Sequence, residues 1–208
     1  NNFFKKITAF FKTNIKSISI ILFLFLLAFI SFQIYAFYSS SKIKKNSISF
    51  FQLQNIEDIN LKKNTILELS NNKDIYGVLS KLQLIEINLN QQNYQDAINL
   101  YDDLLNDSNL EIIYKSAIAA QASYNFLDLN FDDLSMNYLD IINNYILLID
   151  DKLNNFKSVK LELKYLREIL FGEINKVKYQ NNKEALNIHN SLMNSDVGSS
   201  TKERINKI

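Results

Sequence analysis

The sequence has 208 residues with 23 Lys and Arg against 22 Asp and Glu, so its formal net charge at pH 7 is +1. This balance argues against a nucleic-acid-binding surface, which needs an excess of basic residues. The absence of cysteine excludes disulfides, thiolate metal sites and cysteine nucleophiles, and the absence of proline, with only three glycines, favours an all-α fold.

The first predicted element is an apolar segment that follows a short basic stretch, residues 1–16. No charged residue lies between Lys16 and Lys42, and the 25 residues between them would form a helix of about 37 Å. Because the hydrocarbon core of a bilayer is about 30 Å thick, we predict a transmembrane helix over residues 17–41. A cleaved signal peptide is the alternative, although its apolar region usually has about 7–15 residues. The flanking lysines favour a cytoplasmic N-terminus only weakly.

Residues 42–72 are predicted to form a helical linker. Apolar side chains recur there at loosely helical spacing: Phe50, Leu53, Ile56 and Leu61. Asp74 is a suitable N-cap for the next helix, which we expect to end at about Leu89. An apolar stripe follows this helix at steps of three and four residues: Val78, Leu82 and Ile85.

One apolar spacing occurs twice in the chain, 37 residues apart. In residues 93–105, offsets 0, 3, 7 and 10 are occupied by Tyr94, Ala97, Tyr101 and Leu104. In residues 130–142, the same offsets are occupied by Phe131, Leu134, Tyr138 and Ile141. These offsets place the four side chains on one side of a helix. Each copy is therefore predicted to be the second helix of a hairpin, whose remaining apolar face needs a neighbouring hairpin.

Further helices complete the predicted repeat domain, residues 73–208. A first helix from Leu110 to about Leu127 is expected to bury four side chains: Ile113, Ala117, Ala120 and Tyr124. A long helix from about Ser158 to Tyr179 precedes a fainter third copy, formed by Ala185, His189 and Leu192. Residues 142–157 would hold an extended helix or a longer connector, and residues 201–208 a short terminal helix. The predicted fold class is an N-terminal transmembrane helix followed by a short α-solenoid of helical hairpins.

The sequence gives little support to catalysis, and no catalytic, cofactor-binding or metal-binding residue is predicted. His189 occupies a packing position of the third copy and has no partner at a recognisable spacing. Three pairs of adjacent aspartates occur: Asp102–Asp103, Asp132–Asp133 and Asp150–Asp151. Adjacent acids on a helix diverge by about 100°, so a solvated face is a better explanation than a metal site. An enzyme, a small-molecule substrate and nucleic acid are not expected.

The spacing Tyr94-x2-Ala97-x3-Tyr101 resembles the second half of a tetratricopeptide repeat, although the first-helix Trp and the closing Pro of that repeat are missing. The layout of basic N-terminus, single span, helical linker and degenerate repeats resembles the ancillary SecYEG translocon subunit (YfgM-like) family. That resemblance implies a bitopic protein of the bacterial inner membrane with a cytoplasmic N-terminus and a periplasmic repeat domain. The implied partners are Sec translocon subunits, periplasmic chaperones or exported client proteins.

A stack of such hairpins offers a groove lined by its first helices. The resemblance places candidate protein-binding residues on two of these helices: Leu79, Glu86 and Leu89 on one, and Ser116, Ser123 and Phe126 on the next. The alternative for Leu79, Leu89 and Phe126 is packing between hairpins. The alternative function is a structural scaffold for an envelope complex, in outer-membrane assembly or in cell division.

Overall fold

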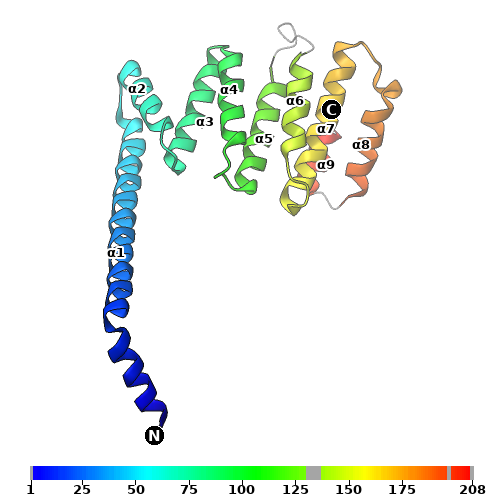
Figure 1. The fold of residues 1–208 in the computed structure, drawn as a ribbon. Coiled ribbons are helices and arrows are strands. Elements are labelled where there is room, and N and C mark those ends of the chain that lie inside the picture. Colours follow the sequence, from blue (N-terminus) through cyan, green and yellow to red (C-terminus); the bar gives the residue numbers. More distant parts are fainter. Residues whose placement is uncertain (1, 130–136, 196–197, 207–208) are drawn as a thin grey trace. The chain divides into compact units, whose positions relative to one another are not determined.

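The computed structural model describes residues 2–129, 137–195 and 198–206. Within these ranges the chain contains α-helices, short 3-10 turns and no strand, which confirms the predicted all-α fold. The helices are α1 (Asn2–Gln52), α2 (Ile59–Ser70), α3 (Ile75–Asn90), α4 (Tyr94–Asn106), α5 (Ile112–Leu127), α6 (Asn137–Leu148), α7 (Asn154–Ile174), α8 (Lys183–Asn194) and α9 (Ser199–Ile205) (Figure 1). The chain divides into two compact units, residues 1–83 and 84–208, and the division falls within α3.

Helix α1 of the first unit contains the predicted span. It is long and apolar enough to cross a membrane, and none of its apolar window is buried within the protein. Phe25 and Phe37, for example, are 72% and 78% exposed. Large apolar side chains at such exposure are stable in lipid and unfavourable in water, so the predicted transmembrane segment agrees with the surface of this helix.

The rest of the first unit is stabilised by helix caps and a small apolar contact. The residues of the predicted helical linker form the end of α1, a 3-10 turn (Leu53–Asn55) and α2. Leu53, Ile66 and Leu69 are buried where α2 packs against α1. The predicted N-cap of α3 is also confirmed, because Oδ1 of Asp74 accepts hydrogen bonds from the first backbone amides of that helix, 3.0 and 3.1 Å long. A Cβ at Gly77 would lie 1.9 Å from the backbone oxygen of Asn72, so only glycine fits there.

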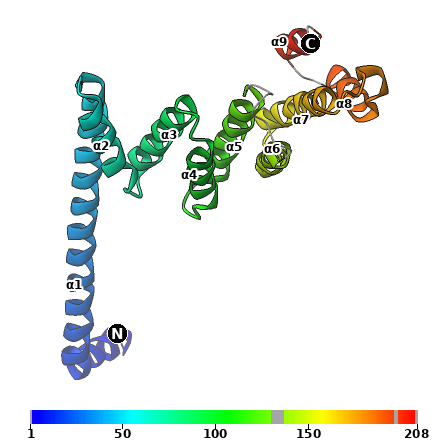
Figure 2. The same cartoon turned by 90° about the horizontal axis from the view of Figure 1, so that it is seen from above.

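The second unit stacks helices α4 to α8, and its core confirms the first copy of the repeat. Ala97, Tyr101 and Leu104 are at most 1% exposed on one face of α4. Helices α5, α6 and α7 lie side by side, and a second view shows α4 beside α5 and α7 beside α8 (Figure 2). The rings of Tyr101, Phe126 and Tyr145 pack together with centroid separations of 5.8–6.2 Å, so three successive helices share one aromatic core.

The structure corrects the predicted inward face of α5. Ile113 and Ala117 were expected inside but are exposed, and Tyr124 is only half-buried. Of the four predicted residues, only Ala120 is buried. A fully buried set with the spacing 0, 3, 7 and 10 begins instead at Ser116 and consists of Ser116, Ala119, Ser123 and Phe126. Helix α5 packs against α4, α6 and α7, and small side chains allow several helix backbones to approach. The resemblance placed Ser116 and Ser123 on the exposed side of this helix, whereas their small size allows them to occupy the buried side.

The second copy of the repeat is also shifted from its predicted place. Phe131 and Leu134 lie outside the described residues, and Tyr138 and Ile141 are half-buried. Helix α6 is described from Asn137 to Leu148, and α7 begins at Asn154. The segment predicted to hold an extended helix or a longer connector therefore contains the end of α6, a short turn and the start of α7. The α6 segment buries a neighbouring set of side chains: Leu139, Ile142, Tyr145, Ile146 and Ile149.

The C-terminal helices close the second unit with their own apolar cluster. Tyr165 of α7, Ala185 and Leu192 of α8, and Ile205 of α9 are all at most 2% exposed, so two of the three residues of the faint third copy pack as predicted. His189 is half-buried, with its ring 5.7 Å from that of Tyr165. Helix α7 begins and ends about four residues earlier than predicted, and α9 confirms the short terminal helix.

Candidate functional site

A groove of about 520 Å³ lies in the second unit between the end of α3 and the C-terminal half of α5. Both are first helices of successive hairpins, which is where the sequence placed a binding groove. The residues that line it are Ile85, Glu86, Leu89, Asn90, Gln121, Asn125, Asp128 and Leu129. Three of these side chains are amides and two are carboxylates, so the lining is mainly polar.

Two of the six candidate residues from the sequence line this groove. Glu86 is exposed and Leu89 is half-buried, and both belong to the part of α3 that lies in the second unit. Leu79 is half-buried in the first unit and does not line the groove. The role of Glu86 and Leu89 in binding a partner stays a prediction.

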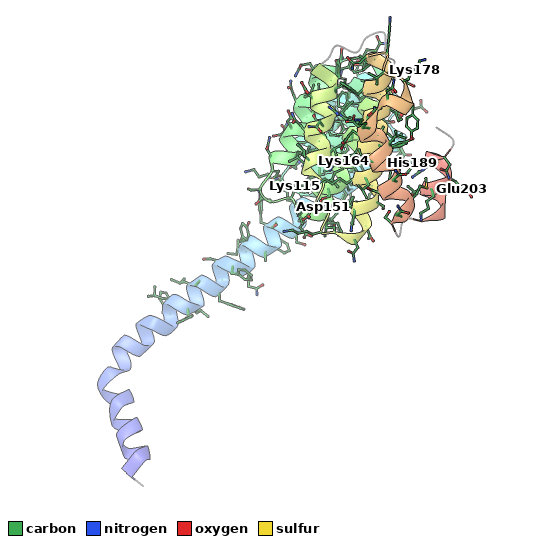
Figure 3. All side chains as sticks on the ribbon, turned by 90° about the vertical axis from the view of Figure 1, so that its right-hand side faces the viewer. Lys115, Asp151, Lys164, Lys178, His189 and Glu203 are labelled. Atoms are coloured by element: carbon green, nitrogen blue, oxygen red, sulfur yellow. The ribbon has the colours of Figure 1, made fainter. Side chains whose placement is uncertain are left out.

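The other three candidates are buried, so their expected exposure is wrong. Ser116, Ser123 and Phe126 each have 0% exposure. The hydroxyl oxygen of Ser116 accepts a 3.1 Å hydrogen bond from the backbone N–H of Asp150, which joins the start of α5 to the turn after α6. Figure 3 shows the neighbouring residues Lys115 and Asp151 at the same end of the unit.

The other two buried candidates, Ser123 and Phe126, make contacts within the core. The hydroxyl of Ser123 donates a 2.8 Å hydrogen bond to the carbonyl of Ala119, one turn earlier in the same helix. The ring of Phe126 stacks on Tyr145 at a centroid separation of 6.0 Å. The alternative considered for Phe126, packing between hairpins, is therefore the one that the structure supports.

Sequence reasoning missed the part of the groove that α5 contributes. Gln121 and Asn125 lie one turn apart and therefore on one side of this helix, and Asp128 follows one turn later. The signal was the polar series at steps of three and four. It could be recognised only after the buried face of α5 had been assigned to Ser116, Ala119, Ser123 and Phe126.

The amide of Asn125 is held in place by the repeat's own core. Its Nδ2 donates a 2.8 Å hydrogen bond to the hydroxyl oxygen of Tyr101, which is itself 0% exposed. Burial raises the pKa of Tyr101 to about 12, and the hydrogen bond from Asn125 lowers it by less. The phenol therefore stays neutral at physiological pH. The Nδ2 of Asn125 is bound to the core through one N–H, while its Oδ1 can accept a hydrogen bond from a partner.

The charge of the groove is negative. Glu86 and Asp128 are both exposed carboxylates, and none of the lining residues is basic. Amide side chains can pair with the N–H and C=O groups of a peptide backbone, because each carries both donors and an acceptor. The combination suits an extended peptide that carries positive charge.

Other polar clusters in the described ranges have structural partners. Asp151 lies 3.6 Å from Nζ of Lys160, and Asp150 accepts a 2.9 Å hydrogen bond from the backbone N–H of Lys152. Asp132 and Asp133 fall outside the described residues. In the part of the chain that the structure describes, no three His, Asp or Glu side chains come together in a way that could hold a metal ion.

A family model described as a tetratricopeptide repeat-like domain matches residues 8–134, which is more than half of the chain. No curated protein and no solved structure matches the chain. The matched range includes α3, α4 and α5, and thus both helices that line the groove. Domains of this class are typically non-catalytic modules for protein–protein interaction. The chain therefore belongs to the tetratricopeptide repeat-like family.

Proposed function

We propose that this protein is a single-span membrane protein whose hairpin domain binds an extended, basic segment of a partner protein. The observation that carries the proposal is the groove between α3 and α5, where three amides and two carboxylates are gathered on two successive first helices. Hairpin repeats use this surface because their first helices face the same side of the stack.

The amide and the carboxylate side chains of the groove would bind different parts of the partner. Asn90, Gln121 and Asn125 bind the peptide backbone, and Tyr101 fixes the orientation of Asn125 before a partner arrives. Such pre-organisation lowers the entropic cost of binding. Glu86 and Asp128 attract lysine or arginine side chains of the partner.

We also propose a cellular location and a set of partners for the hairpin domain. The domain is exported, and its partners are Sec translocon subunits, periplasmic chaperones or exported client proteins. The layout supports this part, because a basic N-terminal stretch, one apolar helix and a helical linker precede the hairpins, as in the ancillary translocon subunits that the sequence resembles.

Topology tests the exported location. A series of phosphatase and β-galactosidase fusions made beyond Ser41 should report phosphatase activity at every position. Galactosidase activity at those positions would place the hairpins in the cytoplasm and remove the periplasmic partners, while leaving the groove proposal intact.

Affinity purification from membranes with the intact chain tests the groove. The double substitution Glu86→Lys and Asp128→Lys should lose most of the partner, because both attractive charges become repulsive. Asp96→Lys with Asp140→Lys is the matched control, since it makes the same change of charge at exposed acids outside this groove. Recovery of outer-membrane assembly or cell-division proteins in place of translocon subunits would favour the scaffold function.

A further inference from the structure

A second hollow lies in the first unit, where α1 leaves the predicted membrane span. It has a volume of about 410 Å³ and lies between α1 and α2. The residues that line it include Ser41, Lys42, Lys45 and Ser49 on α1, and Thr65 and Glu68 on α2. Two ammonium groups, three aliphatic hydroxyls and one carboxylate therefore border one small space.

The two lysines are placed on a common side of α1 by their spacing of three residues. Neither has an ion pair with a carboxylate in the described part of the chain. Lys42 also borders a neighbouring hollow of about 310 Å³, which Lys73 lines as well. Positive charge without a protein partner is thus concentrated at this end of the span.

The nearby acids compensate this charge only in part. Asp74 uses Oδ1 to cap α3, and its Oδ2 accepts a 2.7 Å hydrogen bond from Asn46. Glu68 is exposed and lines the larger hollow, so it opposes the binding of an anion. Its single charge stands against those of Lys42 and Lys45.

The position along α1 indicates which anion these groups meet. The predicted span ends at residue 41, and Lys42 and Lys45 follow within one helical turn. Phospholipid phosphates lie at this depth, just outside the hydrocarbon core. Tyr38, which borders both hollows, is 69% exposed and is of a residue type that favours the membrane interface.

We propose that the hollow between α1 and α2 binds the phosphate of an anionic phospholipid headgroup. Lys42 and Lys45 neutralise the phosphate, and the hydroxyls of Ser41 and Ser49 donate hydrogen bonds to its oxygens. The hydroxyl of Thr65 also lines the hollow, but it donates its proton to the carbonyl of Leu61, 2.9 Å away. Lysines that merely extend toward the headgroups need no hollow and no converging hydroxyls. This site is separate from the groove between α3 and α5, so either proposal can fail without the other.

The test uses the full-length protein in vesicles of phosphatidylcholine with a minor fraction of phosphatidylglycerol. The protein is extracted with its bound lipids, and mass spectrometry measures the enrichment of phosphatidylglycerol over the bulk membrane. We expect Lys45→Gln to reduce this enrichment about tenfold, which corresponds to the loss of one hydrogen bond to a charged group. Glu68→Gln should increase the enrichment, because it removes the opposing charge.

Lys44→Gln is the matched control. Lys44 is adjacent in sequence, exposed and equally close to the span, but it lines neither hollow. An equal loss in Lys44→Gln and Lys45→Gln would overturn the proposal, since it would show a general surface charge effect. Unchanged enrichment in Lys45→Gln would overturn it as well. Displacement of the lipid by added inorganic phosphate would show that a soluble anion, and not a headgroup, is the ligand.

Discussion

The hydroxyl of Tyr145 on α6 donates a 3.2 Å hydrogen bond to Oδ1 of Asp102 on α4, 43 residues earlier in the chain. These two helices are the second helices of successive hairpins, and the ring of Tyr145 also lies 5.8 Å from that of Tyr101. Burial and then the charge of Asp102 raise the pKa of Tyr145, so its phenol remains a donor. One buried side chain thus connects two hairpins through both its ring and its hydroxyl.

Replacing Tyr145 by phenylalanine should remove the connection to Asp102 while keeping the ring. The free energy of unfolding is expected to fall by about 1–2 kcal/mol, the usual effect of losing one partly buried hydrogen bond. Urea unfolding of the detergent-solubilised protein, followed by circular dichroism, measures the change. Tyr114→Phe is the control, because Tyr114 is 50% exposed and its replacement should be nearly neutral. Equal free energies of unfolding for the two variants would show that the hydrogen bond between Tyr145 and Asp102 does not stabilise the packing of the two hairpins.

The protein should lose stability as the pH rises from about 10 to about 12, the window set by the pKa of Tyr101. Burial raises this pKa from 10.0 to about 12. An unfolded chain releases the phenolic proton near pH 10, whereas the folded protein keeps it until near pH 12, so ionisation stabilises the unfolded chain across this window. The pKa difference between the folded and the unfolded state corresponds to about 2–3 kcal/mol of unfolding free energy for one phenol. Well below pH 10 the phenol is protonated in both states, so this contribution is fully present.

Urea unfolding at a series of pH values tests this dependence. Tyr101→Phe should be less stable than the parent near neutral pH, because Asn125 loses its acceptor, but its stability should decline less steeply above pH 10. Tyr124, whose pKa burial and the charge of Glu162 also raise to about 12, would still titrate in the variant. A decline with the same slope in both proteins would contradict the buried position of Tyr101.

Two neighbouring alanines distinguish the observed face of α5 from the expected one. Ala119 has 0% exposure, whereas Ala117 is exposed. Ala119→Leu should lower the free energy of unfolding by about 1–3 kcal/mol through overpacking. Ala117→Leu should change it by less than about 0.5 kcal/mol. The reverse order in denaturant unfolding would restore the face that the sequence predicted.

Periodicity predicted the helices well wherever the buried residues are also apolar. The stripe of α4 could be recognised because Tyr101 and Leu104 are large and apolar and Ala97 is small. Asp74 could be identified as a cap because a short polar side chain directly precedes an apolar helix. In both cases a local property of the residue is enough to decide its place.

Residues whose place depends on several neighbouring helices could not be predicted in the same way. Ser116 and Ser123 are buried because α5 contacts three other helices, which no spacing within α5 reveals. Because the buried face of α5 was assigned wrongly, Gln121 and Asn125 could not be recognised as groove residues. The side of a helix that faces a groove can be identified only after its buried side is known. The bond between Asn125 and Tyr101 joins residues 24 positions apart and required the fold itself.

Site-specific photo-cross-linking in membranes tests the groove most directly. A photoreactive amino acid at Gln121, inside the groove, is compared with one at Asn99, which is exposed on α4 and does not line it. We expect a discrete cross-linked partner from position 121, absent from position 99 and absent when Glu86 and Asp128 are both lysine. Equal cross-linking from both positions, or none from position 121 while the partner still co-purifies, would contradict binding in this groove.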